Sequence, residues 1–242
     1  MKLKKILVMV GMALLTLGIS SCEIEDHFLT PVGNSVTVKK SFSNYSEISV
    51  GSGFQLYLKQ DGTESVEIQT NENLLPYIES YQKGNMIYFY REENVNFTGN
   101  AIVKIYVSAK EINALEATGG SSIRAETDLT SDNLALNFSG GSSLQAEIIS
   151  KNLLANLSGG STFDISGKSS SLLINGSGGS IVNGVNHQTD YLTANFSGGS
   201  ILYMTVNKNL SLSLSGGSII NYYGDGIVVS SINTGGSRVI KK

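Results

Sequence analysis

Carboxylates are the side chains best suited to chemistry in this chain, yet their spacing does not bring them together. Glycoside hydrolysis needs two carboxylates across one bond, and a lyase needs a base, usually with acids that hold a metal. A Gly-Gly-Ser triplet recurs through the C-terminal half, and the offset of each aspartate from the first glycine of the preceding triplet can be compared. The offsets are 9, 13, 5, 12 and 9 for Asp128, Asp132, Asp164, Asp190 and Asp225. No two consecutive repeats share an offset, so we predict no catalytic and no metal-binding residues.

Histidine and serine do not supply a nucleophilic site either. The only histidines are His27, in an N-terminal linker, and His187. Serines are abundant, but no histidine–carboxylate pair is placed to activate one. We therefore predict that the protein is not an enzyme and needs no cofactor. A glycan-processing enzyme on the same architecture is the rival hypothesis.

Amide side chains do recur at a fixed place. Three residues before the first glycine of successive triplets stand Asn137, Asn156, Asn175 and Asn195, followed by Ser213. One interpretation is structural, because stacked asparagines hydrogen-bond to one another and reinforce adjacent strands. The other is a polar binding face for a glycan or a protein.

Three tyrosines near the C-terminus are a second candidate for binding. Tyr203, Tyr222 and Tyr223 lie in the last repeats, and aromatic faces can stack on sugar rings. The alternative is that they fill the core or cap its end, since large aromatic side chains mostly serve burial.

The element that must position these residues is the triplet repeat itself. The gaps between the first glycines are 21, 19, 19, 20, 18 and 19 residues, and this period indicates a solenoid in which each repeat forms one coil. The seven triplets are Gly119-Gly120-Ser121, Gly140-Gly141-Ser142, Gly159-Gly160-Ser161, Gly178-Gly179-Ser180, Gly198-Gly199-Ser200, Gly216-Gly217-Ser218 and Gly235-Gly236-Ser237.

Apolar residues recur six, four and two positions before most triplets and four positions after the first glycine of every triplet. A period of two predicts strands with one buried face. The glycines would form sharp corners, because they reach positive φ and let stacked coils approach closely. A phosphate-binding loop is excluded, since it needs glycines that open a helix. The Ca²⁺-binding nonapeptide is excluded too, because its nearest match, Gly159 to Asp164, lacks the third glycine.

The N-terminus has the features of a bacterial lipoprotein signal. Lys2, Lys4 and Lys5 precede an apolar stretch over residues 6–19 that is too short to span a bilayer stably, and Leu17-Gly18-Ile19-Ser20-Ser21-Cys22 resembles a lipobox. We therefore expect a signal peptide over residues 1–21 and lipidation of Cys22, which would attach the protein to a membrane. Cys22 is the only cysteine, so no disulfide forms within the chain.

The charge argues against nucleic acid as a partner. Removing residues 1–21 removes three lysines and no acid, which changes the formal charge from −3 to −6. Residues 22–35 read as a tether. Its Glu23, Glu25 and Asp26 resemble an export signal to the outer face of the outer membrane, or form only a solvated spacer. We expect an outer-membrane lipoprotein on the periplasmic or the cell-surface face.

From Val36 onward, apolar and polar residues alternate as they do in β-strands, with turns expected at Gly51–Gly53 and at Asp61-Gly62. Residues 73–83, with Pro76 near their start, are expected to form a short helix. No linker interrupts the rest, so residues 36–242 are predicted to be one all-β domain. Its expected fold is a solenoid of about 19–20 residues per coil, with the Gly-Gly-Ser triplets at its corners.

The strand block, the short insert and the repeated small-residue triplets together resemble the head GIN domain family of auto-transporter adhesins of Bacteroidetes. The resemblance covers roughly residues 36–242, including Gly224-Asp225-Gly226-Ile227 and the last triplet. It implies that the fold is a right-handed parallel β-helix and that the protein is exported, and it assigns no catalytic residues. We therefore expect a lipid-anchored, non-enzymatic binding or scaffold module for an unknown glycan or protein ligand. A purely structural envelope protein is the further alternative.

Overall fold

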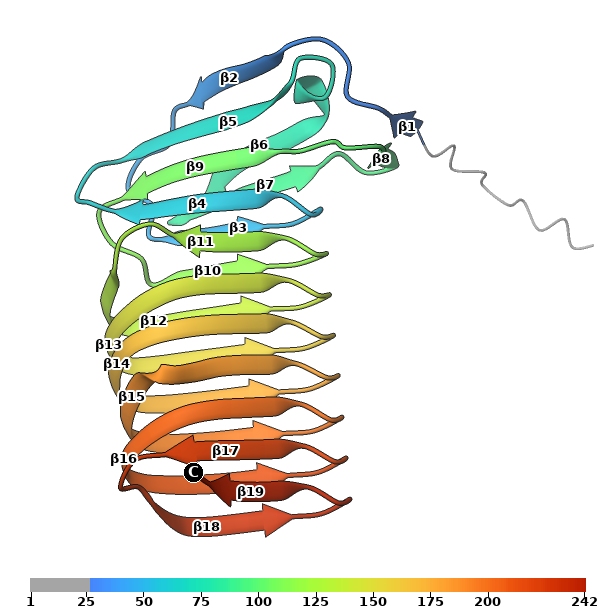
Figure 1. The fold of residues 1–242 in the computed structure, drawn as a ribbon. Coiled ribbons are helices and arrows are strands. Elements are labelled where there is room, and N and C mark those ends of the chain that lie inside the picture. Colours follow the sequence, from blue (N-terminus) through green and yellow to red (C-terminus); the bar gives the residue numbers. More distant parts are fainter. Residues whose placement is uncertain (1–26) are drawn as a thin grey trace, which may run out of the picture.

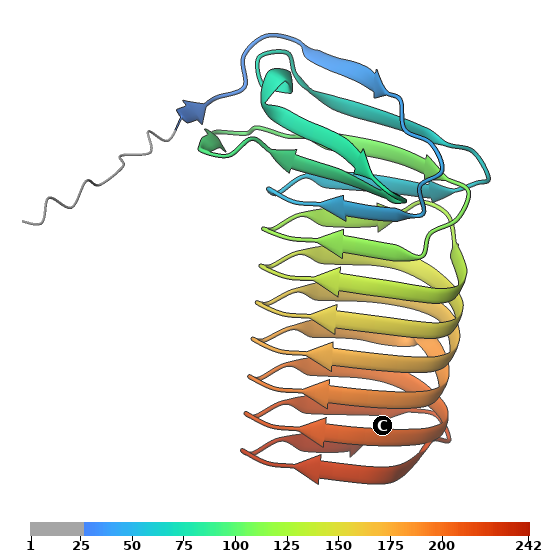
Figure 2. The same ribbon diagram turned by 180° about the vertical axis from the view of Figure 1, so that it is seen from behind.

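The chain forms a right-handed parallel β-helix closed at its N-terminal end by a cap of antiparallel strands. The computed structural model describes residues 27–242. The coils stack as a straight column from the cap to the C-terminus, and the corners between their two long sides form one edge of that column (Figure 1, Figure 2). Within the described residues, one 3₁₀ turn is the only helical segment.

The solenoid is built from long strands that each bend through most of a coil. β13 to β16 each run from one triplet to the next, so a single strand supplies both long sides of its coil. The strands pair in parallel with the coil before and the coil after. The strands are β10 (Ala114–Ala117), β11 (Ser122–Ala125), β12 (Leu129–Phe138), β13 (Ser143–Leu157), β14 (Thr162–Gly176), β15 (Ile181–Phe196), β16 (Ile201–Leu214), β17 (Ile219–Tyr223), β18 (Ile227–Asn233) and β19 (Arg238–Lys241).

The predicted apolar positions do form the core. In one coil, Leu134, Leu136, Phe138 and Leu144 are each at most 2% exposed, and the equivalent residues are buried in the same way through Ile220. In the last coil the equivalent positions before the triplet are exposed, with Val229 at 58%. The residues between them point outward. We call the sheet that precedes the triplets the pre-corner sheet, and the sheet that follows them the post-corner sheet.

The triplets are tight corners, as their composition predicts. Gly178 and Gly179 have φ values of +65° and +80°, a region that residues with a Cβ rarely adopt. A Cβ on Gly178 would lie 3.0 Å from the backbone nitrogen of Gly159 in the coil before, whereas one on Gly179 would point into open space. Ser180 is fully buried, and its hydroxyl donates to the Ser177 carbonyl at 2.7 Å. The corners thus stack backbone on backbone.

The cap continues the core through mixed pairing. β2 and β9 both pair antiparallel with β5, β6 pairs antiparallel with β7, and β3 and β4 join this unit to the first coil in parallel. Its elements are β1 (His27–Leu29), β2 (Ser35–Lys40), β3 (Glu47–Val50), β4 (Gln55–Gln60), β5 (Ser65–Asn71), the 3₁₀ turn η1 (Leu75–Tyr77), β6 (Ile78–Lys83), β7 (Met86–Arg91), β8 (Val95–Phe97) and β9 (Lys104–Ala109).

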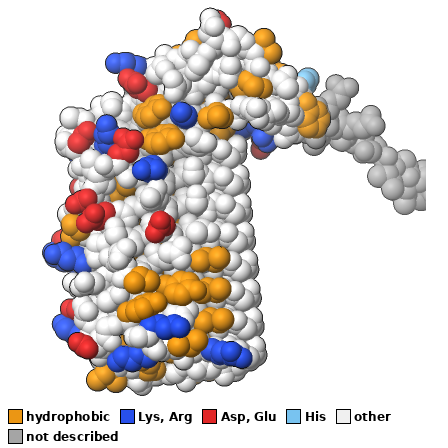
Figure 3. Space-filling view, viewed as in Figure 1, with side chains coloured by type: hydrophobic (Ala, Val, Ile, Leu, Met, Phe, Trp, Pro, Cys, Tyr) orange, Lys and Arg blue, Asp and Glu red, His pale blue; other side chains and the backbone are white. Residues whose placement is uncertain are grey.

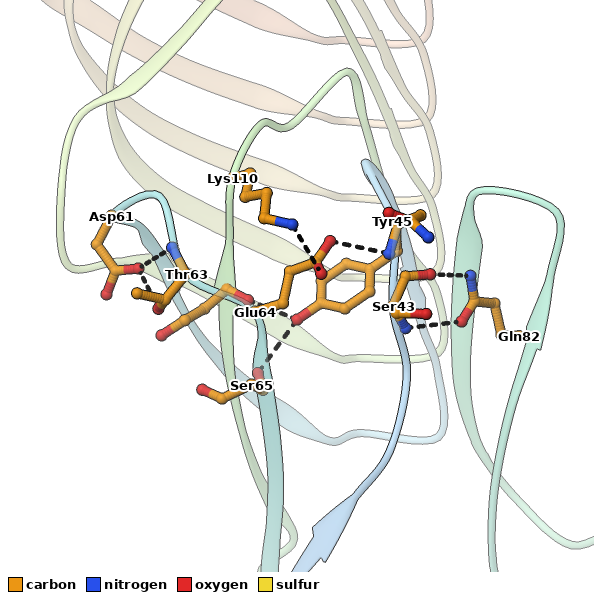
Figure 4. A network of polar contacts seen from close by, with 10 residues as sticks. Ser43, Tyr45, Asp61, Thr63, Glu64, Ser65, Gln82 and Lys110 are labelled. Atoms are coloured by element: carbon orange, nitrogen blue, oxygen red, sulfur yellow. Dashed lines mark hydrogen bonds and ion pairs between the residues drawn. The ribbon is translucent and has the colours of Figure 1, made fainter.

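A polar cluster ties the loops of the cap together (Figure 4). The Glu64 carboxylate accepts hydrogen bonds from the Asn44 backbone N–H at 2.9 Å and from the Lys110 ammonium at 3.1 Å. The Tyr45 hydroxyl donates to the carbonyls of Ser65 and Ser108. Burial, with a smaller contribution from Glu64, raises the pKa of Tyr45 to about 12. Tyr45 therefore stays neutral and serves as a structural donor.

The predicted helix over residues 73–83 is wrong beyond its first turn. Only Leu75–Tyr77 is helical, with Pro76 at its start, and Ile78–Lys83 is strand β6. Tyr81 of β6 stacks on Tyr88 of β7 with ring centroids 4.8 Å apart. Pairing with β7 outweighs a weak local preference for helix, because a short isolated helix has little stability of its own.

Part of the segment expected to be a tether lies against the cap. β1 pairs in parallel with β8, and the Asn73 side chain accepts from the Val32 N–H and donates to the Thr30 carbonyl, both at 2.8 Å. No helix within residues 27–242 has the length and apolar character to cross a membrane.

Candidate binding face

The asparagines singled out by their spacing form a continuous side-chain ladder on the pre-corner sheet. Asn156 donates its side-chain N–H to the Oδ1 atom of Asn137 at 2.8 Å. Asn175 donates to Asn156 at 2.7 Å, and Asn195 donates to Asn175 at 2.9 Å. The structural interpretation of the column is therefore confirmed. It leaves a binding role open, because each amide has hydrogen-bonding capacity that the ladder does not use.

The ladder has a direction. Every N–H end points toward the N-terminal cap and every C=O end points toward the C-terminus, so the amide dipoles are aligned. The first member of the column is Glu116, which lies in register with Asn137 and accepts from it at 3.5 Å. A carboxylate there accepts from the donor end of the row of aligned amides.

Above Glu116 the polar chain continues into the cap. Ser49 donates to Glu116 at 3.2 Å and is also hydrogen-bonded to the Tyr90 hydroxyl. Tyr88, in register with Ser49, stacks on Tyr81 and lies beside Tyr90, with ring centroids 6.3 Å apart. The ladder thus begins at a carboxylate beside a cluster of tyrosines. Burial raises the pKa of Tyr90, so its hydroxyl remains protonated.

A column of hydroxyls runs parallel to the ladder. It consists of the residues directly before the first five triplets, which are Thr118, Ser139, Ser158, Ser177 and Ser197. Between the two columns lies an open groove of about 490 Å³, lined by both and by Glu116. This volume is within the usual range of ligand sites in proteins.

The other side of the ladder is more apolar. Leu154 and Leu173 point outward and are 37% and 38% exposed. Beyond them Asn152 donates to Asn133 at 2.8 Å, which makes a second, shorter amide pair. A smaller hollow of about 420 Å³ lies along the leucines and these amides. Along each strand, the pre-corner sheet therefore presents four parallel columns: the shorter amide pair, the leucines, the asparagine ladder and the hydroxyls.

The three tyrosines proposed from the sequence do not share a face with the asparagines. Tyr203 lies on the post-corner sheet, in register with Asn183 and Asn221. Tyr222 is only 7% exposed and belongs to the core, with Met204 beside it in register. Tyr223 is half-buried at the end of β17. Core filling is therefore what the structure shows for Tyr222.

The post-corner sheet changes character along its length. The outward column that begins with Ser122, Ser143 and Thr162 continues in register as isoleucines over the later coils. These are Ile181, Ile201 and Ile219. Figure 3 shows hydrophobic side chains gathered over the lower coils of this sheet, with cations among them.

Two aspartates of the coils form surface ion pairs. Asp132 pairs with Lys151 at 2.7 Å, and Asp190 pairs with Lys208 at 2.8 Å. Hydrogen bonds from Lys208 and Asn207 lower the pKa of Asp190. Within residues 27–242, no three His, Cys, Asp or Glu side chains are grouped to hold a metal. The predicted lipidation site, Cys22, lies outside the described residues.

His187 is not on the surface but inside the solenoid. It is fully buried, with Nε2 3.0 Å from the Ser169 hydroxyl and Nδ1 3.1 Å from the Ser166 carbonyl. Burial lowers its pKa. Gly167 lies in register with His187 and lets the backbone approach the preceding coil closely, because a Cβ there would lie 2.2 Å from the Ile148 carbonyl oxygen.

Several groups of this face escape the sequence reasoning. Glu116 was detectable, since it occupies the same offset as the asparagines in the first repeat. Asn133 and Asn152 also share an offset, seven residues before the first glycine. Ser49 and Tyr90 carry no such signal, because the cap lacks the repeat and reaches the ladder only through tertiary pairing.

Comparison with known proteins identifies both a family and a fold. The family model described as "Putative auto-transporter adhesin, head GIN domain" matches residues 44–226. No curated protein matches the sequence.

Solved structures of the same fold come from Bacteroides and Parabacteroides species. A protein of Bacteroides fragilis described as a "putative adhesin" superposes with a TM-score of 0.84 at 16% identity, over 88% of this chain and 100% of that one. A "putative lipid binding protein" of Parabacteroides distasonis gives a TM-score of 0.72 at 18% identity, over 89% and 99% of the two chains. A "putative adhesin" of Parabacteroides merdae gives 0.69 at 18% identity, over the same two shares.

Proposed function

Because this chain belongs to the family described as "Putative auto-transporter adhesin, head GIN domain", we propose that it is a non-enzymatic, lipid-anchored binding module of the outer membrane. Its role is adhesin-like: a rigid solenoid presents a binding face away from the anchor. The ligand is a glycan or a protein.

The groove beside the asparagine ladder is the observation that carries this proposal. A hollow of about 490 Å³ runs over consecutive coils and is lined by amides and hydroxyls in fixed positions. Stacked parallel strands hold these groups rigidly, so binding costs little conformational entropy. A purely structural rod does not require an open groove of this kind along one of its faces.

The described residues offer the groove no obvious catalytic partner. Glu116 is its only carboxylate, and glycoside hydrolysis needs two carboxylates on either side of the bond. The buried His187 cannot act as a base at the surface. These observations favour binding over turnover.

The membrane attachment is proposed from the sequence. The lipobox ends at Cys22, whose sulfur receives a diacylglycerol that serves as the anchor, and Glu23, Glu25 and Asp26 follow it closely. Since His27 begins β1 beside the cap, the anchor joins the solenoid at its capped end. The coils then extend from the cap, on the periplasmic or the cell-surface face of the outer membrane.

A panel that scores binding and cleavage together tests the function. Protein lacking residues 1–21, with Cys22 changed to serine, is screened on arrays of glycans and of extracellular-matrix proteins, and products are followed by chromatography. We expect binding without product release. Release of sugar products would contradict the binding proposal and support the enzyme alternative, and absence of binding on both arrays would favour the structural one.

A further inference from the structure

We infer that the ligand of the groove is an uncharged polysaccharide that lies along the solenoid axis, with one sugar unit to each coil. This inference rests on the proposed binding function and adds the ligand class, its orientation and its length. We define the glycan groove as the surface between the asparagine ladder (Glu116, Asn137, Asn156, Asn175 and Asn195) and the hydroxyl column (Thr118, Ser139, Ser158, Ser177 and Ser197).

The spacing of the coils favours a sugar chain over a peptide. Adjacent strands lie about 4.8 Å apart, so polar groups repeat along the groove at that interval. In an extended peptide, the side chains on one face recur every two residues, or about 6.7 Å. A peptide lying along the groove would therefore lose register with the polar groups within two coils. A pyranose unit is close to one coil in length, so a linear glycan keeps its register.

The two columns also match the two edges of a pyranose ring. Each ladder amide uses one N–H and one lone pair along the axis, which leaves one donor and one acceptor for a ligand. The hydroxyl column stands about two residues, or roughly 6 to 7 Å, farther along the strands. A ring lying between the columns therefore meets a donor and an acceptor at both of its edges.

Charge excludes the acidic glycans. The groove contains one charged side chain, Glu116, and none of its lining residues is a lysine or an arginine. Uronic-acid or sulfated polymers would bring anions close to Glu116 without a compensating cation, and the chain without its signal is itself acidic. A neutral glycan can instead donate a hydroxyl hydrogen bond to Glu116 at the capped end of the groove.

A chain-length series tests the inference. Calorimetric affinities are measured for malto-, cello-, manno- and chito-oligosaccharides from dimer to octamer, with oligogalacturonates as the acidic comparison. For one of the neutral series we expect affinity to rise with length and to level off at about five units, because the ladder has five coils from Glu116 to Asn195. The oligogalacturonates should not bind.

Variants then place the ligand. Asn175→Ser, which removes a ladder amide, should weaken binding about three- to tenfold, as expected for one or two hydrogen bonds. Ser177→Tyr should abolish binding by filling the groove without removing a ladder contact. The controls are Asn183→Ser and Thr162→Tyr on the post-corner sheet, which should bind as the parent does. Circular dichroism and melting of each variant confirm that it is folded.

The outcomes separate this inference from the proposed function. Binding of a neutral glycan that is unchanged by Ser177→Tyr would overturn the assigned groove. Binding only of acidic glycans, or only of a protein on the array, would overturn the ligand class while leaving an adhesin-like function standing. Absence of any binding would overturn both.

Discussion

Replacing Gly178 or Gly179 by alanine should separate the two roles of glycine at a corner. Both residues lie in the left-handed region, with φ of +65° and +80°, so either alanine carries about 1–2 kcal/mol of backbone strain. Only Gly178 also meets the neighbouring coil, where a Cβ would lie 3.0 Å from the Gly159 nitrogen and 3.3 Å from its Cα.

This contact with the neighbouring coil should add to the stability lost when Gly178 is replaced. The obstructing atoms are backbone atoms held by stacked strands, so they cannot rotate away as a side chain would. Overpacking of this kind costs about 1–3 kcal/mol. We therefore expect Gly178→Ala to lower the free energy of unfolding by about 2–4 kcal/mol, and Gly179→Ala by only about 1–2 kcal/mol.

Urea unfolding followed by circular dichroism measures the difference. The two variants are matched in residue type, corner and φ region, so the comparison isolates contact between coils. The m-values must agree with that of the parent, because repeat arrays can lose two-state behaviour. If Gly178→Ala is no worse than Gly179→Ala, close packing of the coils is not what the first glycine provides.

The remaining predictions concern the anchor, the ladder and the buried histidine. Cys22→Ala should leave the domain folded but release it from membranes or block its maturation; a mutant that fractionates with membranes and is cleaved like the parent would contradict the lipoprotein assignment. Asn156→Ala breaks two ladder hydrogen bonds and should cost about 1–2 kcal/mol in urea unfolding, whereas the control Asn183→Ala should cost less, and equal losses would show that the ladder adds no stability. Burial lowers the pKa of His187, so below about pH 6.5 the unfolded chain binds a proton that the folded chain does not. Stability should therefore be full above that pH and fall on acidification, by at most about 1.4 kcal/mol per pH unit from this group. Unfolding at pH 7.5 and pH 5.5 should show a smaller loss for His187→Gln than for the parent, and identical losses would refute the assignment.

The coils were predictable because the strand pattern, the corner residues and the repeat period all indicate the same structure. Leu134, Leu136 and Phe138 alternate as a strand, and the Gly140-Gly141 pair that follows supplies a corner with the required φ. The same agreement recurs at one period, which specifies stacking as well as strands. Handedness followed from the resemblance to known β-helices and is confirmed by the path of the chain (Figure 1).

The cap was less predictable because it has no repeat. Residues 78–83 have no glycine or proline to mark a strand, and their pairing with β7 is a contact that the local sequence does not encode. The ladder could be located from the offset of Asn137 and Asn156, but its polarity could not. The polarity of the ladder depends on the orientation of each side-chain amide. The structure shows that orientation through the hydrogen bond that Asn137 donates to Glu116 at the first position.

Each coil contacts mainly its two neighbours, which makes the length of the protein an adjustable quantity. Residues 159–177 begin at one Gly-Gly-Ser corner and end immediately before the next, so their loss or duplication would restore the same corner sequence at the junction. The cap and the final coil would be unchanged, while the row of asparagines would shorten or lengthen by one. Relatives could therefore differ in reach by whole coils, and variation by duplication would adjust the span of the surface without redesigning any contact.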